Sequence, residues 1–96
     1  MAKPKSVMIY GKRVKIKYIK GLIDDDEING DYCQNKKEIR IDASLRGPDL
    51  TSTLIHEIIH AIFDRIGVNQ GVDSGVEEVI CDSIAGFLTE NWSFDF

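Results

Sequence analysis

The sequence predicts an α+β domain in which a small antiparallel β-sheet packs on two helices, all within a single domain of residues 1–96. In the first forty residues, apolar and polar side chains alternate as they do in half-buried strands. From Gly47 onward the apolar side chains recur with helical spacing instead. The composition, 43% hydrophobic and 29% charged, is that of a globular chain and not of a disordered one.

The expected sheet comes from two hairpins. Strand-like alternation occurs in residues 7–10, 13–18, 31–33 and 38–41. Gly11-Lys12 separates the first two segments, and Gln34–Lys37 separates the last two, as turns between paired strands do. The polar stretch between Gly21 and Gly30 is predicted to be a loop.

The second half of the chain predicts two helices joined by a short loop. The first begins at Pro48, where a missing N–H costs nothing, and ends at Ile66, just before a glycine. The second is capped by Asp73 or Ser74 and continues to about residue 91. Two consecutive helices of this length form a helical hairpin.

The first helix contains the motif His56-Glu57-Ile58-Ile59-His60, which includes the only two histidines of the chain. Residues four apart on a helix differ by about 40° in direction, so both imidazoles can reach one ion. Glu57 lies further round the helix, where its carboxylate can hydrogen-bond a water molecule at that ion. A helical His-Glu-x-x-His is a known metalloprotease signature, and it predicts a zinc site held by His56 and His60. The alternative is a pair of surface histidines on an amphipathic helix.

The third ligand must come from a residue other than histidine. In a helical hairpin, residues 6–9 Å into the second helix lie level with the motif, which leaves Glu77, Glu78 and Cys81. We favour Glu78 because the small residues Cys81 and Ala85 lie near it on the helix and allow a close approach. Glu77 and Cys81 remain as alternatives. Asp82, one turn after Glu78, is placed to hold a ligating histidine through its second ring nitrogen.

Three segments of the chain resemble the small metallopeptidase-like proteins of phages and prophages, which are similar to minigluzincins and, more distantly, to the ImmA/IrrE and SprT-like groups. The segments are residues 37–42, 53–62 and 78–88. The resemblance implies a zincin-like core with zinc as cofactor, Glu78 as third ligand and Asp82 as its supporting partner. It also implies that Glu38–Ile41 is the edge strand beside the cleft, where an extended peptide or protein substrate adds to the sheet.

The expected function is therefore that of a zinc-dependent peptidase of the gluzincin type, with Glu57 as general base. The alternative is a non-catalytic, metal-stabilised phage accessory domain that binds a protein partner. The short chain supports this alternative, as does the lack of an obvious donor for the oxyanion, for which Arg65 or a backbone N–H is a candidate.

The charge pattern argues against a nucleic-acid partner. Seven of the twelve basic residues fall within the first twenty positions, followed by the acidic run Asp24–Glu27. With a net charge of −4 and no interleaved aromatic residues, we interpret the basic residues as the solvated face of the sheet. The acidic run lacks the spacing of a calcium loop.

No apolar stretch is long enough to span a membrane or to serve as a secretory signal. We therefore expect a cytoplasmic protein of a bacterial host cell, with Cys33 and Cys81 as reduced thiols.

Overall fold

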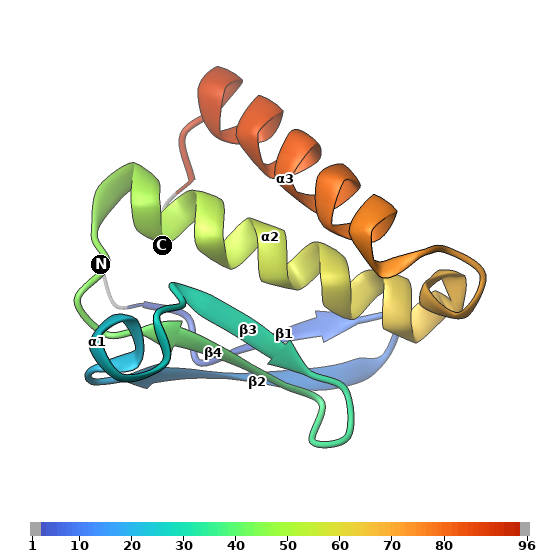
Figure 1. Cartoon of the computed structure of the whole chain (residues 1–96), viewed down its shortest axis with the longest axis horizontal. Helices are drawn as coiled ribbons and strands as arrows, with labels where there is room; N and C mark the ends of the chain where they lie inside the picture. The colour runs from blue at the N-terminus through green and yellow to red at the C-terminus, as the bar shows by residue number, and fades with distance from the viewer. Residues whose placement is uncertain (1–2, 95–96) are drawn as a thin grey trace.

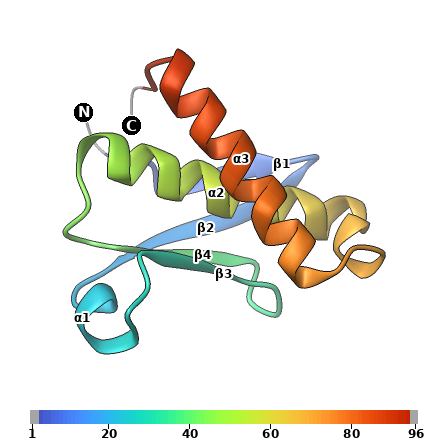
Figure 2. The same cartoon turned by 45° about the horizontal axis from the view of Figure 1, so that its top comes forward.

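The computed structural model describes residues 3–94 and has an α+β fold, as predicted. Its elements are β1 (Ser6–Ile9), β2 (Lys12–Ile19), α1 (Leu22–Asp26), β3 (Gly30–Cys33), β4 (Glu38–Asp42), α2 (Gly47–Ile66), the 3-10 turn η1 (Val68–Gln70) and α3 (Ser74–Asn91). Figure 1 shows three layers: the sheet lies below α2, and α3 crosses α2 on the side away from the sheet. The same arrangement is visible after rotation (Figure 2).

The sheet is mixed, which corrects the prediction of a purely antiparallel sheet. The strand order is β1-β2-β4-β3, and both predicted hairpins form as antiparallel pairs. β2 and β4, however, are parallel neighbours, with Ile16 opposite Ile39. The hairpin of β3 and β4 thus joins the sheet through its second strand, a long-range pairing that hairpin signals do not specify.

This strand order also overturns the expectation that Glu38–Ile41 is an edge strand. β4 lies between β2 and β3, and its Ile39 and Ile41 are fully buried. Their bulk suits an interior strand covered by α2. The edge beside α2 is β3, whose first residue is Gly30. A side chain at Gly30 would meet the carbonyl oxygen of Arg40 at 2.7 Å and Thr53 at 3.1 Å, so the glycine allows β3 to pack closely against its neighbours.

Part of the segment predicted to be a loop is the short helix α1. Leu22 at its start is buried, and the N–H of Ile23 donates to Oδ1 of Asp42 at 2.9 Å. This bond satisfies one of the backbone donors that a helix start leaves unpaired. Glu27 ends the helix in a left-handed conformation with φ of 59°. A buried leucine and a distant aspartate therefore order a segment whose local sequence reads as polar.

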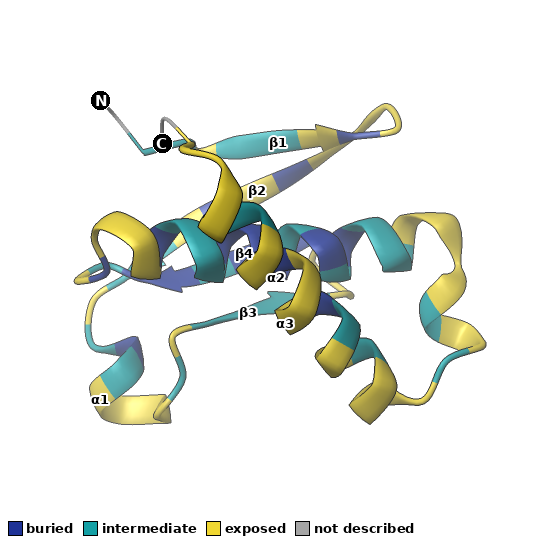
Figure 3. Ribbon diagram, turned by 90° about the horizontal axis from the view of Figure 1, so that it is seen from above, coloured by how far each residue is buried: buried dark blue, intermediate teal, exposed yellow. Residues whose placement is uncertain are grey.

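Two apolar clusters hold the layers together. The larger fills the space between the sheet and α2, and includes Val14, Ile16, Ile39, Ile41 and Leu54. The smaller lies between α2 and α3, and contains Ile55, Ile59, Cys81 and Ala85. The outer face of α3 stays exposed (Figure 3). Small residues at Cys81 and Ala85 bring α3 close to α2, which places the carboxylates of α3 beside the motif.

The helix ends match the predictions. Gly67 follows α2 in the left-handed conformation, with φ of 82°, and the carboxylate of Asp73 accepts the N–H of Gly75 at 2.8 Å. Among residues 3–94, no helix has the length and apolar character needed to cross a bilayer.

Candidate metal centre

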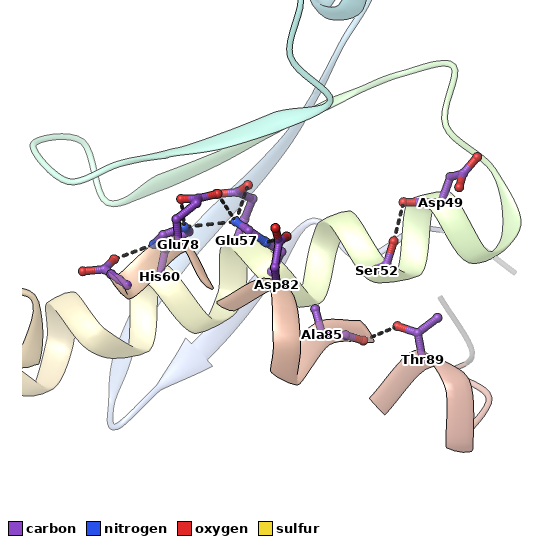
Figure 4. Close-up of polar contacts among 10 residues, drawn as sticks. Asp49, Ser52, Glu57, His60, Glu78, Asp82, Ala85 and Thr89 are labelled. Atoms are coloured by element: carbon purple, nitrogen blue, oxygen red, sulfur yellow. Dashed lines mark hydrogen bonds and ion pairs between the residues drawn. The ribbon is translucent and has the colours of Figure 1, made fainter. Parts of the chain in front are cut away.

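The ring nitrogens of His56 and His60 on α2 converge with the carboxylate of Glu78 on α3. The two Nε2 atoms are 3.1 Å apart. Oε1 of Glu78 lies 2.7 Å from Nε2 of His56, and its Oε2 lies 3.0 Å from Nε2 of His60. Figure 4 shows Glu78 reaching over the motif from the neighbouring helix. The three predicted ligands therefore share one point, formed where α3 crosses α2.

The other ring nitrogen of each histidine faces a carboxylate of α3. Nδ1 of His56 lies 2.8 Å from Oδ1 of Asp82, in the place expected from the sequence. Nδ1 of His60 lies 2.5 Å from Oε2 of Glu77. A carboxylate accepts hydrogen bonds, so in neutral rings these contacts place the proton on Nδ1 and leave a lone pair on Nε2. Glu77, an alternative ligand by sequence, thus supports His60 from the far side of the ring.

This donor set fits a metal ion. With both protons on Nδ1, two Nε2 lone pairs and a carboxylate face one another at about 3 Å, which is repulsive unless a cation lies among them. A tetrahedral ion with bonds of 2.0–2.1 Å places its ligand atoms about 3.3 Å apart, close to the spacing seen here. Neutral imidazole and carboxylate are suitable ligands for such an ion. Three overlapping groups at this crossing have ligand atoms within 4.8 Å of one another and could hold a metal ion: His56, Glu57 and His60; His60, Glu77 and Cys81; and His56, Glu78 and Asp82.

Glu57 is buried beside this cluster. Its side chain is 9% exposed, and its Oε2 lies 3.9 Å from Nε2 of His56. Burial raises the pKa of Glu57 to about 7, although the neighbouring His56 and His60 favour the charged form. A cation held by the histidines would shift this pKa downward again. Glu57 is thus a carboxyl group that can exchange a proton near neutral pH, as a general base must.

The surroundings of this cluster also shift the pKa values of His60 and Cys81. Burial alone would lower the pKa of His60, but the bond to Glu77 and the nearby Glu57 and Glu78 raise it instead. Burial raises the pKa of the Cys81 thiol to about 12, and the surrounding carboxylates add to the effect. Cys81 is fully buried between α2 and α3, and with His60 and Glu77 it forms one of the groups that could hold a metal ion.

A groove with two chambers passes over the cluster. Both chambers are lined by Gly30, Glu57 and Glu78, so they meet at the site. Chamber 1, of about 430 Å³, extends toward the end of β3 and the C-terminal part of α2, at Tyr32 and Asp64. Chamber 2, of about 560 Å³, extends the other way, toward residues 27–29 and the N-terminal part of α2. Strand β3 borders chamber 1, and its first residue, Gly30, also lines chamber 2.

The side chain considered for the oxyanion points elsewhere. Nη2 of Arg65 donates to the carbonyl oxygen of Tyr10 at 3.0 Å, in the β1–β2 turn. Tyr32 also lines chamber 1, but its Oη donates to Oδ2 of Asp64 at 2.6 Å. Tyr32 precedes the motif by more than twenty residues and reaches the groove only through strand pairing, so local sequence signals did not place it there.

Comparison of the chain with protein-family models, with curated proteins and with solved structures gives no match.

Proposed function

We propose that the protein is a zinc-dependent peptidase in which His56, His60 and Glu78 hold the metal. The observation that supports this most directly is the convergence of two Nε2 atoms and one carboxylate, with Glu57 buried alongside. A structural zinc site has four protein ligands, whereas three leave a position for substrate or water. When bound, zinc supplies a Lewis acid that polarises a peptide carbonyl and acidifies a water molecule.

The residues of the chain supply the remaining chemistry. Glu57 takes a proton on its carboxylate from the attacking water and passes it to the leaving amine. Burial leaves this carboxylate poorly solvated, which favours its taking up a proton, whereas a cation held by the histidines would favour its charged form. Glu77 and Asp82 hold the imidazole rings in one orientation through their Nδ1 atoms.

The groove supports an extended peptide as substrate. β3 is an edge strand that pairs with β4, so its other edge presents unpaired backbone groups along chamber 1 and, at Gly30, where chamber 2 begins. An extended chain can form main-chain hydrogen bonds with such an edge. The substrate strand therefore belongs beside Gly30–Cys33, in place of the Glu38–Ile41 edge expected from the sequence.

A second candidate is a metal-stabilised domain that binds a protein segment without cleaving it. The engagement of Tyr32 by Asp64 and of Arg65 by Tyr10 favours it, because neither side chain is then directed at a developing oxyanion. Both candidates use the same groove and the same ligands. They differ in whether Glu57 transfers a proton.

Zinc-loaded protein should be incubated with a broad mixture of synthetic peptides, and new termini identified by mass spectrometry. We expect cleavage that stops on chelation and returns with zinc. Glu57→Gln should keep its zinc and reduce turnover about 10²- to 10⁴-fold. The matched control is Glu90→Gln, an exposed carboxylate of α3 outside both chambers, which should cleave normally. Unchanged cleavage by Glu57→Gln contradicts the proposed base, and no cleavage by the wild type favours the binding domain.

A further inference from the structure

The groove carries an unbalanced negative charge. Among the residues that line chambers 1 and 2 there is no lysine or arginine. The four carboxylates at the cluster, which belong to Glu57, Glu77, Glu78 and Asp82, outweigh the two positive charges of a zinc ion. A substrate entering the groove therefore meets a negative field even when metal is bound.

The two chambers differ in how their remaining carboxylates are neutralised. In chamber 1, Asp31 forms a bidentate pair with Arg40, at 2.8 and 2.6 Å, and Asp64 accepts Nζ of Lys37 at 2.7 Å. Each acidic residue there has its own cation from outside the groove. Chamber 1 therefore adds little net charge to that of the cluster.

Chamber 2 has no such compensation. Glu27 lines it, and Asp24 and Asp25 lie within the preceding turn of α1. All three are exposed, and within residues 3–94 their carboxylates form no hydrogen bond or ion pair. Asp26, the fourth member of the run, lies 4.0 Å from Nη1 of Arg40, which is already engaged by Asp31. The acidic run thus extends the negative field of the cluster toward the outer end of chamber 2.

α1 is ordered by contacts that leave these carboxylates pointing to solvent. Leu22 is buried, Asp42 accepts the N–H of Ile23, and the left-handed Glu27 turns the chain into residues 28–30 of the groove wall. Glu27 is therefore held in the wall of chamber 2, and Asp24 and Asp25 lie within one helical turn of it. In this position the unpaired carboxylates attract a lysine or arginine side chain of a substrate.

We infer that chamber 2 binds the part of a peptide substrate that carries lysine or arginine, and that α1 sets this preference through Asp24, Asp25 and Glu27. This inference rests on the proposed peptidase function, because it names the substrate class of the same groove. Chamber 1 then accepts a neutral segment on the other side of the scissile bond. The preference is electrostatic, so salt weakens it.

The test compares peptides that share one cleavable core. One peptide has lysine on the N-terminal side of the scissile bond, one has lysine on the C-terminal side, and one has glutamine at both places. We expect one lysine peptide to be cleaved with a kcat/KM about three- to tenfold above that of the glutamine peptide, because exposed charge pairs contribute modestly. The advantage should disappear at about 0.5 M salt.

The variants assign the preference to α1. Glu27→Gln should reduce the lysine advantage, and the triple variant Asp24→Asn, Asp25→Asn, Glu27→Gln should abolish it. The readout for each variant is the ratio of kcat/KM for the lysine peptide to kcat/KM for the glutamine peptide, and Glu90→Gln should keep the wild-type ratio. If both lysine peptides are cleaved no faster than the glutamine peptide, or if the triple variant keeps the preference, the inference is wrong while the peptidase function stands.

A binding measurement keeps the inference testable without turnover. Zinc-loaded Glu57→Gln protein should bind a fluorescent lysine peptide about three- to tenfold more tightly than the glutamine peptide. Introducing the three α1 substitutions into the same protein should remove this difference in affinity. Equal affinities for the two peptides would overturn the inference. If the lysine peptide binds more tightly but the zinc-loaded wild type cleaves neither peptide, the peptidase function is wrong and the charge preference of the groove stands.

Discussion

Removing the charge of Glu77 should weaken metal binding although Glu77 is not one of the three proposed ligands. Glu77→Gln preserves the shape of the side chain but replaces the carboxylate that faces Nδ1 of His60 at 2.5 Å. An amide can accept this hydrogen bond less strongly, and it can also rotate to present its NH₂ group to the ring. His60 then loses its fixed orientation and its preferred tautomer.

The size of the effect follows from the burial of the pair. The side chains of His60 and Glu77 are 16% and 13% exposed, so solvent screens their interaction little. A hydrogen bond to a charged group contributes about 1.5–3 kcal/mol in such surroundings, which corresponds to a loss of about 10- to 100-fold in zinc affinity. Asp82 makes the same kind of contact to His56, but its side chain is 75% exposed. An exposed pair contributes about 0.2–1 kcal/mol, so Asp82→Asn should cost less than about fivefold.

The assay is competition for zinc against a fluorescent chelator at one fixed pH, with wild type, Glu77→Gln and Asp82→Asn measured side by side. Far-UV circular dichroism of the three proteins checks that the fold is retained. The reasoning is refuted if Asp82→Asn weakens binding as much as Glu77→Gln, because burial would then not determine the strength of these contacts.

Three further predictions concern stability. Burial opposes the charged form of Asp64, but hydrogen bonds from Lys37 and Tyr32 outweigh it and hold the pKa of Asp64 below its usual range. The unfolded chain therefore binds the proton more tightly, so stability falls as pH drops below about 4, and urea titrations of Asp64→Asn should show a smaller fall. Ile39→Ala should cost about 2–5 kcal/mol in urea unfolding because Ile39 is fully buried, whereas Ile66→Ala, at a 52% exposed position, should cost less than about 1 kcal/mol. Removing zinc with a chelator should lower Tm by about 10 °C or more by calorimetry, and an unchanged Tm would mean that no tightly bound ion contributes.

Local signals predicted most of the elements. Neighbouring residues determine the period-two alternation of β1 and β2 and the turn that joins these strands. They also determine the end of α2 at Gly67 and the cap of α3 at Asp73. These features form through contacts of short sequence separation, which a sequence displays directly. The motif belongs to the same class, because a spacing of four on a helix fixes the directions of His56 and His60.

The predictions were wrong or incomplete for features that depend on contacts between distant residues. The parallel pairing of β2 with β4 joins segments about twenty residues apart, and nothing in either strand distinguishes it from an antiparallel partner. The exchange of edge strand from β4 to β3 follows from that pairing. α1 forms because Asp42 accepts the N–H of Ile23, a bond across nineteen positions.

The two carboxylates that support the histidines show the same limit. Asp82 lies on the face of α3 that includes Glu78, so helical spacing was enough to place it beside His56. Glu77 lies about 100° from Glu78 on the helix and was expected only as an alternative ligand. Its contact with His60 depends on the angle at which α3 crosses α2, which helical spacing does not specify.

The most direct test of the metal centre is a crystal structure of zinc-saturated protein with data collected on both sides of the zinc absorption edge. The account predicts a single strong anomalous peak about 2.0–2.2 Å from Nε2 of His56, Nε2 of His60 and a carboxylate oxygen of Glu78. It is contradicted if the peak lies instead among His60, Glu77 and Cys81, or if zinc-saturated crystals show no peak between α2 and α3.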